Sequence, residues 1–255
     1  MDFCFNTGIA ENYTSNPQKI RVLSEDWVAK NIFCPVCGNL HISKMNNNMP
    51  VADFQCDNCG EIYELKSKQG KFGTKINDGA YATMLERING ASNPDLFIMN
   101  YSKDYQVINL ILIPKFFFVE SIIEKRKPLS PTARRVGWVG CNIIFGDVPT
   151  QGKIKIIENQ KVYKTEEIVQ NYARIKKLQT KNLENRGWLM DVLNCINEIN
   201  TNDFSLKDVY AYVEKLQEKH IDNHNIEAKI RQQLQVLRDK GFIEFTTRGC
   251  YRKIV

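Results

Sequence analysis

Two closely spaced cysteine pairs are the feature that most constrains how this chain can fold. The first pair begins at Cys34 as CPVCG, the second begins at Cys56 as CDNCG, and 18 residues separate them. This spacing is typical of a four-cysteine zinc ribbon, in which the glycine after each pair permits the tight turn that brings backbone amides to the thiolates. Because four thiolates leave no open coordination position, the sequence predicts a structural zinc ion. The predicted ligands are Cys34, Cys37, Cys56 and Cys59.

The amino terminus favours metal binding over disulfide formation as the role of these pairs. It has neither the charged and apolar segments nor the small-residue cleavage site of a signal peptide. No apolar run approaches the roughly 18 residues of a membrane span, so we expect a cytoplasmic protein with no membrane partner. In a reducing compartment, paired cysteines are more often metal sites than disulfides. The other cysteines lack such spacing and are expected to be small core residues: Cys4, Cys141, Cys195 and Cys250.

Acidic residues flank the second cysteine pair. If this pair forms the turn of a hairpin, one arm carries Asp53 and the other carries Glu64 and Lys66. Alternation along a strand puts Glu64 and Lys66 on one face, with Leu65 pointing into the core. Carboxylates suit Mg²⁺, and a neighbouring lysine can orient or deprotonate a water that attacks a phosphodiester. An acid followed by E-x-K is common by chance, often as a solvated ion pair, so this prediction depends on the segments around it.

Charge and composition predict two domains. Residues 1–182 hold 24 basic and 18 acidic residues, whereas residues 183–255 hold 11 of each. The basic excess is compatible with a polyanionic partner, although many proteins that bind no nucleic acid are equally basic. A polar, basic stretch over residues 176–187 indicates a boundary near residue 183. We therefore predict one domain over residues 1–182 and a second over residues 183–255.

Helices and strands are mixed in the first predicted domain. Residues 15–33 have the periodicity of an amphipathic helix, with Glu25 and Asp26 on the face opposite the apolar residues. A segment rich in glycine, proline and basic residues, 125–146, predicts a long structured loop. The other predicted elements are strands over 62–65, 95–100 and 107–113 and a helix over 78–88.

The second predicted domain has the pattern of a winged helix. Three helices, over 188–199, after Ser205 and over 226–237, precede a hairpin that turns at Arg248 and Gly249. In this fold the third helix usually enters the DNA major groove. The alternative is that the polar face is simply solvated or that the domain binds a protein, as many winged helices do. The domain's zero net charge favours this alternative. The predicted DNA contacts are Ala228, Arg231, Gln232, Gln235, Arg248 and Arg252.

Several segments resemble a known enzyme family. VADF followed by ELKSK resembles the PD-(D/E)xK nuclease core, and INDGAYATM, RKPLSPTARRVGWVGCNI and IRQQLQVLRDK are similar to the DpnI-like methyl-directed restriction endonucleases. The likeness runs over nearly the whole chain. It implies an α/β (α+β mixed) PD-(D/E)xK nuclease domain with an inserted four-cysteine zinc ribbon, followed by a winged-helix domain. Ala52 stands where the motif has proline, and we expect this backbone difference to leave the chemistry intact.

The resemblance also implies an activity and its cofactors. The chain would be a type II site-specific deoxyribonuclease of a restriction system, a monomer that cuts double-stranded DNA at GATC sites containing N6-methyladenine. Asp53, Glu64 and Lys66 would be catalytic, and Mg²⁺ would lie on Asp53, Glu64 and the carbonyl of Leu65. The alternative function is a regulator that binds DNA through its zinc ribbon and winged helix without cutting it.

One tryptophan is a candidate sensor of the methyl group. An N6-methyl group adds an apolar surface in the major groove, so its reader needs an apolar side chain there. Trp138 lies between two glycines that would let the backbone approach DNA, and Arg134 and Arg135 can contact phosphates or guanine edges. The alternative is that Trp138 anchors the loop in the core, which is how most tryptophans are used.

Overall fold

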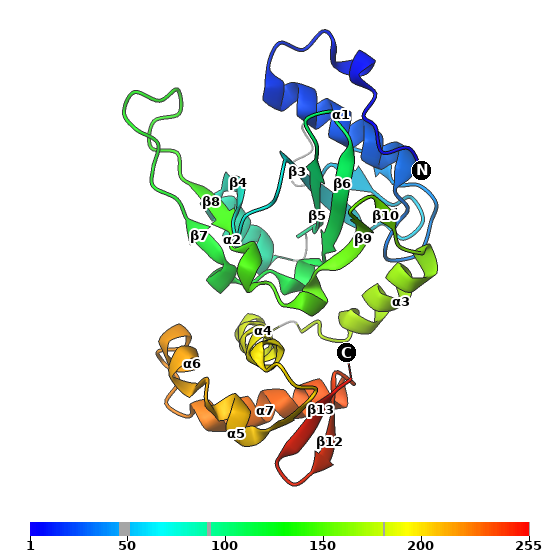
Figure 1. Cartoon of the computed structure of the whole chain (residues 1–255). Helices are drawn as coiled ribbons and strands as arrows, with labels where there is room; N and C mark the ends of the chain where they lie inside the picture. The colour runs from blue at the N-terminus through cyan, green and yellow to red at the C-terminus, as the bar shows by residue number, and fades with distance from the viewer. Residues whose placement is uncertain (46–51, 91–92, 181, 255) are drawn as a thin grey trace. The chain divides into compact units, whose positions relative to one another are not determined.

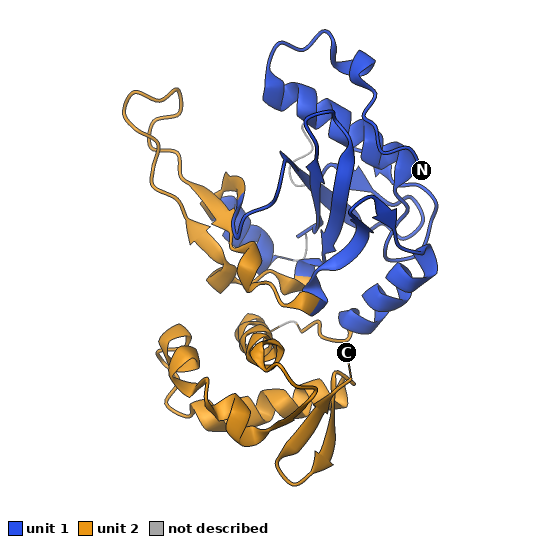
Figure 2. Ribbon diagram, viewed as in Figure 1, with its two compact units in different colours: residues 1–76, 82–115, 151–176 blue, residues 77–81, 116–150, 177–255 orange. Residues whose placement is uncertain are grey.

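Two units of structure divide the chain, and each is assembled from segments that lie apart in the sequence (Figure 2). The computed structural model describes residues 1–45, 52–90, 93–180 and 182–254. Unit 1 comprises residues 1–76, 82–115 and 151–176, and unit 2 comprises residues 77–81, 116–150 and 177–255. The boundary predicted near residue 183 falls within unit 2, and the division into domains 1–182 and 183–255 stays a prediction.

A seven-stranded sheet is the framework of unit 1 (Figure 1). Its strands lie in the order β1-β2-β3-β5-β6-β9-β10. Strands β3 and β5 are parallel, and the other neighbouring strands are antiparallel. Parallel strands need a long connection, and here the chain between β3 and β5 contains β4 (Ile76–Ala80) and α2 (Tyr81–Asn89). The strands are β1 (Ser43–Lys44), β2 (Phe54–Gln55), β3 (Ile62–Gln69), β5 (Asp95–Tyr101), β6 (Val107–Ile113), β9 (Ile154–Glu158) and β10 (Lys161–Val162).

Helices pack on this sheet, and α1 contacts β3 while α3 contacts β9. Pro17 occupies the first turn of α1, where its missing N–H costs no helical hydrogen bond. Among the described residues, no helix has the length and apolar character that crossing a membrane requires. The helices are α1 (Asn16–Asn31), α2 (Tyr81–Asn89) and α3 (Thr165–Lys176), with short 3-10 helices η1 (Thr7–Ala10), η2 (Lys115–Phe117), η3 (Glu120–Ile122), η4 (Phe145–Asp147) and η5 (Thr150–Gly152).

Unit 2 contains a small sheet and a winged helix. In the small sheet, β8 lies between β4 and β7, and residues 126–139 form a projection between β7 and β8 that we call the basic hairpin (Figure 1). In the winged helix, the strand order is β11-β13-β12, and Gly249 has a φ of 74° at the turn that links β12 to β13. The elements are β4 (Ile76–Ala80), β7 (Ile123–Lys125), β8 (Gly140–Ile143), α4 (Leu183–Glu198), β11 (Asp203–Ser205), α5 (Leu206–Tyr210), α6 (Val213–Lys219), α7 (Ile226–Asp239), β12 (Ile243–Thr247) and β13 (Cys250–Lys253).

The mixed α/β architecture and the winged-helix-like carboxy-terminal part confirm the predicted fold class. Local boundaries differ in three places. The helix predicted over 78–88 begins only at Tyr81, because residues 76–80 form β4, which pairs in the sheet with β8. The segment 125–146 contains β8 and so is not all loop, and the helix after Ser205 is interrupted between α5 and α6. Of the four other cysteines, Cys4 is exposed and is no core residue.

Strand β5 is buried at every residue, as expected for a central strand covered on both faces. It nevertheless begins with Asp95, which is fully buried. The Asp95 carboxylate accepts hydrogen bonds from the Lys115 N–H at 2.7 Å and from the Tyr172 hydroxyl at 2.9 Å. Burial, followed by the negative charge of Glu61, raises the pKa of Asp95 from 3.8 to about 7 against these hydrogen bonds.

This raised pKa predicts a pH-dependent stability. Because the folded-state pKa exceeds the value in the unfolded chain, the stability linked to Asp95 is complete below pH 3.8 and is lost as the pH rises to about 7. The Asp95→Asn variant lacks this titration. The free energy of unfolding of the wild type, minus that of the variant, should therefore fall from pH 5 to pH 8 in urea titrations. A difference that grows with pH would contradict this assignment.

Candidate functional site

The second cysteine pair forms the turn of a hairpin between β2 and β3, as the sequence predicts. Phe54 pairs with Tyr63, and Gln55 pairs with Ile62, in an antiparallel register. Directly before β2, the backbone N–H of Asp53 donates to the carbonyl of Tyr63 at 2.8 Å. Asp53 therefore lies opposite the part of β3 that carries Glu64.

The carboxylate of Asp53 is oriented by the backbone of β3. Its Oδ2 accepts a hydrogen bond from the N–H of Leu65 at 2.7 Å. Burial raises the pKa of Asp53; the Leu65 N–H opposes the shift, and the charge of Glu25 adds to it. A carboxylate that is desolvated and lies near a second negative charge is the kind of group that gains most from a bound cation.

Glu64 and Lys66 share one face of β3. The Lys66 Nζ lies 2.6 Å from Oε1 of Glu64, and an Arg87 guanidinium nitrogen lies 3.4 Å from Oε2. Cations therefore contact both oxygens of Glu64. Arg87 comes from α2, so the sequence around the hairpin gave no signal that it would join the site.

Glu25 lies in a different environment from the one that the helical pattern predicts. We expected it on the exposed face of the first helix, but its side chain is 4% exposed, and its carboxylate lies 2.5 Å from Lys44 Nζ and 3.8 Å from Arg21 Nε. Its burial depends on neighbours from elsewhere in the chain, such as Lys44 of β1, which helical periodicity does not reveal. Ser24 of the same helix also meets β3, with its Oγ 3.2 Å from Oγ of Ser67.

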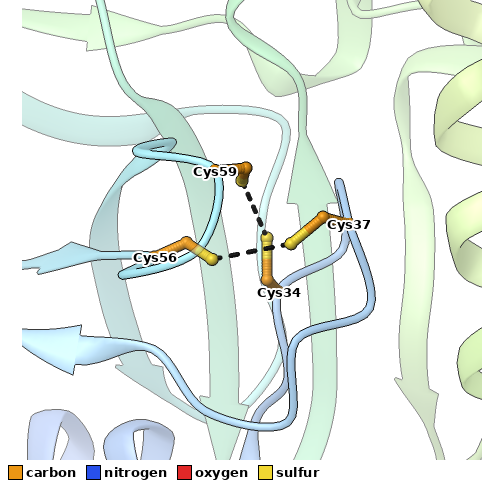
Figure 3. Close-up of side chains that lie close together, drawn as sticks. All are labelled: Cys34, Cys37, Cys56 and Cys59. Atoms are coloured by element: carbon orange, nitrogen blue, oxygen red, sulfur yellow. Dashed lines mark hydrogen bonds between the residues drawn. The ribbon is translucent and has the colours of Figure 1, made fainter.

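The four predicted thiolate ligands converge beside this hairpin (Figure 3). All four sulfurs lie within 4.8 Å of one another, and the Cys34–Cys59 and Cys37–Cys56 Sγ pairs are each 3.6 Å apart. Tetrahedral zinc with Zn–S bonds near 2.3 Å needs sulfurs roughly 3.8 Å apart, so the donor set fits this ion. The same turn recurs in both pairs: Gly38 and Gly60 have φ of 76° and 73°, and each N–H donates to the first cysteine's carbonyl at 2.8 Å.

Hydrogen bonds and burial act on these thiols in opposite directions. Burial raises the pKa of Cys34, although the Tyr63 hydroxyl 3.0 Å away lowers it. At Cys37, burial also raises the pKa, but hydrogen bonds from the Asn58 side chain and the Asn39 backbone outweigh it, and the pKa is lowered to about 6. Because zinc binds the thiolate form, loading the cluster must release the remaining thiol protons.

The winged helix presents a polar face on α7. The predicted contact residues Ala228, Arg231, Gln232 and Gln235 are exposed, whereas the large apolar side chains on the opposite face are buried: Ile226, Ile230, Leu234 and Leu237. Arg231 donates to the Tyr210 hydroxyl at 2.5 Å. In the wing, Arg248 is exposed at the turn, and Arg252 is exposed but paired with Asp203 at 2.7 Å and Glu244 at 3.3 Å.

The basic hairpin exposes Arg134 and Arg135 and holds Trp138 half-buried. The Trp138 ring lies against Gly140: a Cβ atom at that glycine would be only 2.7 and 2.8 Å from two of its ring carbons. The ring is thus packed on backbone at the base of the hairpin. This placement is compatible with an anchor and with a reader whose exposed edge meets a ligand.

The fold and these sites together define a mixed α/β protein with a four-thiolate centre, a pair of acids on a hairpin and a winged-helix domain. The Dam-replacing family model, DpnI, matches residues 1–181, and the model of the Dam-replacing HTH domain, DpnI_C, matches residues 184–253. The chain therefore belongs to the Dam-replacing (DpnI) family. Membership makes it a DNA endonuclease of the methyl-dependent restriction class with a DNA-binding helix-turn-helix domain.

The contact between Trp138 and Gly140 predicts a specific sensitivity. In Gly140→Ala the new methyl group must displace the ring, at a cost of about 1–3 kcal/mol, the range for overpacking. Gly79→Ala, on β4 of the same small sheet, is the matched control, since no atom lies within 4 Å of its added Cβ. Thermal unfolding should show a lower Tm for Gly140→Ala alone. Equal Tm values for the two variants would contradict the packing of this ring.

Proposed function

We propose that this endonuclease hydrolyses double-stranded DNA at GATC sites that contain N6-methyladenine, in a Mg²⁺-dependent type II reaction. The observation that carries the proposal is the Asp53 carboxylate, which the Leu65 N–H holds at 2.7 Å beside the strand that bears Glu64 and Lys66. Family membership supports the class of enzyme, and the resemblance of the DpnI-like segments in the sequence motivates the site and the modified base.

In this proposal Asp53, Glu64 and the Leu65 carbonyl hold the hard cation. Two carboxylates and a carbonyl leave room for water and a substrate phosphate, as Mg²⁺ prefers. When bound, Mg²⁺ would polarise the scissile phosphate and stabilise the charge that develops on it. Lys66, which pairs with Glu64 at 2.6 Å in the free chain, would then orient or deprotonate the attacking water. Arg87 would keep its contact with Oε2 of Glu64.

We assign a structural Zn²⁺ to Cys34, Cys37, Cys56 and Cys59. Thiolates select a softer metal than carboxylates do, so the two centres would bind different ions. The cluster closes the turn between the two arms of the β2–β3 hairpin, and in that position zinc would fix the separation of Asp53 and Glu64.

DNA recognition is assigned to two surfaces. On α7, Gln232 and Gln235 can pair with adenine, whose methylated N6 keeps one hydrogen to donate, and Ala228 and Arg231 lie on the same exposed face. The wing would add Arg248, and Arg252 after exchange of its acidic partners for phosphate. In the basic hairpin, Trp138 would contact the methyl group while Arg134 and Arg135 contact the DNA backbone.

The setting of this activity is part of the same proposal. We expect a monomer with a nuclease domain over residues 1–182 and a winged-helix domain over residues 183–255. It would act in the cytoplasm and destroy invading DNA that carries the methyl mark in a host that lacks it.

Substitution of the acids tests the proposed site. Asp53→Ala and Glu64→Gln should each lower the cleavage rate of a methylated GATC duplex in Mg²⁺ by on the order of a hundredfold or more, because metal stabilisation supplies several kcal/mol. Glu61→Gln is the matched control, since Glu61 lies on the same hairpin but pairs with Lys115. All variants should still shift the duplex in a gel. Unchanged cutting by Asp53→Ala or Glu64→Gln would remove that residue from the mechanism.

Metal analysis tests the assignment of two different ions. Purified protein should contain about one zinc per chain, as a four-thiolate site requires. Brief EDTA treatment should stop cleavage, and added Mg²⁺ should restore it, while the zinc content and circular dichroism stay constant. Zinc-free protein that remains fully folded would refute the structural role of the cluster.

A further inference from the structure

Tyr63 lies between the two proposed metal centres. It belongs to β3, one residue before Glu64, and it is fully buried. Its hydroxyl oxygen lies 3.0 Å from Sγ of Cys34, and its ring stacks on Phe97 with centroids 4.9 Å apart. The side chain is therefore held on the thiolate side of the strand, away from the face that carries Glu64.

The backbone of the same residue contacts the acidic centre. The Tyr63 carbonyl accepts the N–H of Asp53 at 2.8 Å, and Tyr63 is the partner of Phe54 in the hairpin register. Asp53 in turn accepts the N–H of Leu65. One residue thus contacts a thiolate ligand through its side chain and the first proposed Mg²⁺ ligand through its main chain.

The chemistry of the pair fixes the direction of the hydrogen bond. A zinc-bound cysteine is a thiolate, which can only accept, so the phenol must donate to Cys34. Donors to metal ligands orient the ligand and offset the cost of burying its charge. Among the described residues, the other side chain that donates to a cysteine of the cluster is that of Asn58. Its amide lies 3.4 Å from Sγ of Cys37 at an exposed position. The shorter, buried bond from Tyr63 should have the larger effect.

We propose that Tyr63 is a positioning residue that couples the two centres: its hydroxyl strengthens the hold of Cys34 on zinc, and its anchored backbone fixes Asp53 for Mg²⁺. This inference rests on the proposed zinc and Mg²⁺ sites and adds a physical link between them. It differs from simple packing, because a phenylalanine ring would fill the same space against Phe97 and give no hydrogen bond.

The test compares two conservative substitutions in the full-length, zinc-loaded chain. Tyr63→Phe removes the donor to the thiolate. Tyr172→Phe is the matched control, because it removes a similarly buried hydroxyl, which donates to Asp95 at 2.9 Å. Competition with a chromogenic chelator should show zinc bound about 10–100-fold more weakly by Tyr63→Phe, the range for lost partners of metal ligands, and unchanged by Tyr172→Phe.

A second readout follows the coupling. In cleavage of methylated GATC duplexes at saturating zinc, Tyr63→Phe should need more Mg²⁺ for half-maximal rate, whereas the rate at saturating Mg²⁺ should approach that of the wild type. A change confined to the maximal rate would overturn the coupling.

The outcomes separate the inference from the sites on which it rests. Wild-type protein without zinc would overturn the thiolate centre and this inference together. Zinc-loaded wild type with equally tight binding in Tyr63→Phe would overturn the inference alone and leave the zinc assignment standing. Failure of Tyr63→Phe to fold at saturating zinc would also contradict it, since loss of one hydrogen bond is expected to weaken the site and leave the fold intact.

Discussion

The pairing of Asp53 with β3 is the interaction on which the candidate site depends. Two hydrogen bonds define it, from the Asp53 N–H to the Tyr63 carbonyl at 2.8 Å and from the Leu65 N–H to the Asp53 carboxylate at 2.7 Å. Asp53 directly precedes β2, which has only two residues, and a two-stranded ribbon of this kind is marginal by itself. The four-cysteine turn at one end and the parallel neighbour β5 on the other side of β3 supply the missing constraint.

Charge balance around the hairpin accounts for the remaining side chains. Buried or half-buried acids would repel one another in a low dielectric, and here two of them form ion pairs: Glu25 with Lys44, and Glu64 with Lys66. Asp53 accepts a backbone N–H and has a raised pKa. A divalent cation bound by these acids would replace part of the positive charge that the basic side chains supply. In the proposed reaction, Lys66 would then act on the attacking water instead of pairing with Glu64.

Residues close together in sequence were predictable, and those brought in by the fold were not. The spacing of the cysteine pairs and the E-x-K alternation in one strand are local, so the thiolate cluster and the shared face of Glu64 and Lys66 could be read directly. Arg87 reaches Glu64 from a different helix, and Glu25 is buried by tertiary neighbours against its helical pattern. The exposed face of α7 was predicted from the helical periodicity of the sequence. Strand β4 was predicted as part of a helix, because its pairing with β8 is a tertiary contact that local sequence does not reveal.

In the proposed site, Asp53 helps to bind a hard metal ion separately from the thiolates. Manganese, which can replace Mg²⁺ at oxygen ligands, can be counted by its electron paramagnetic resonance signal in the zinc-loaded chain. Titration of wild type and Asp53→Asn should reveal a Mn²⁺ site that the variant loses or binds far more weakly, with zinc content equal in both. Identical Mn²⁺ binding by the two proteins would contradict the account.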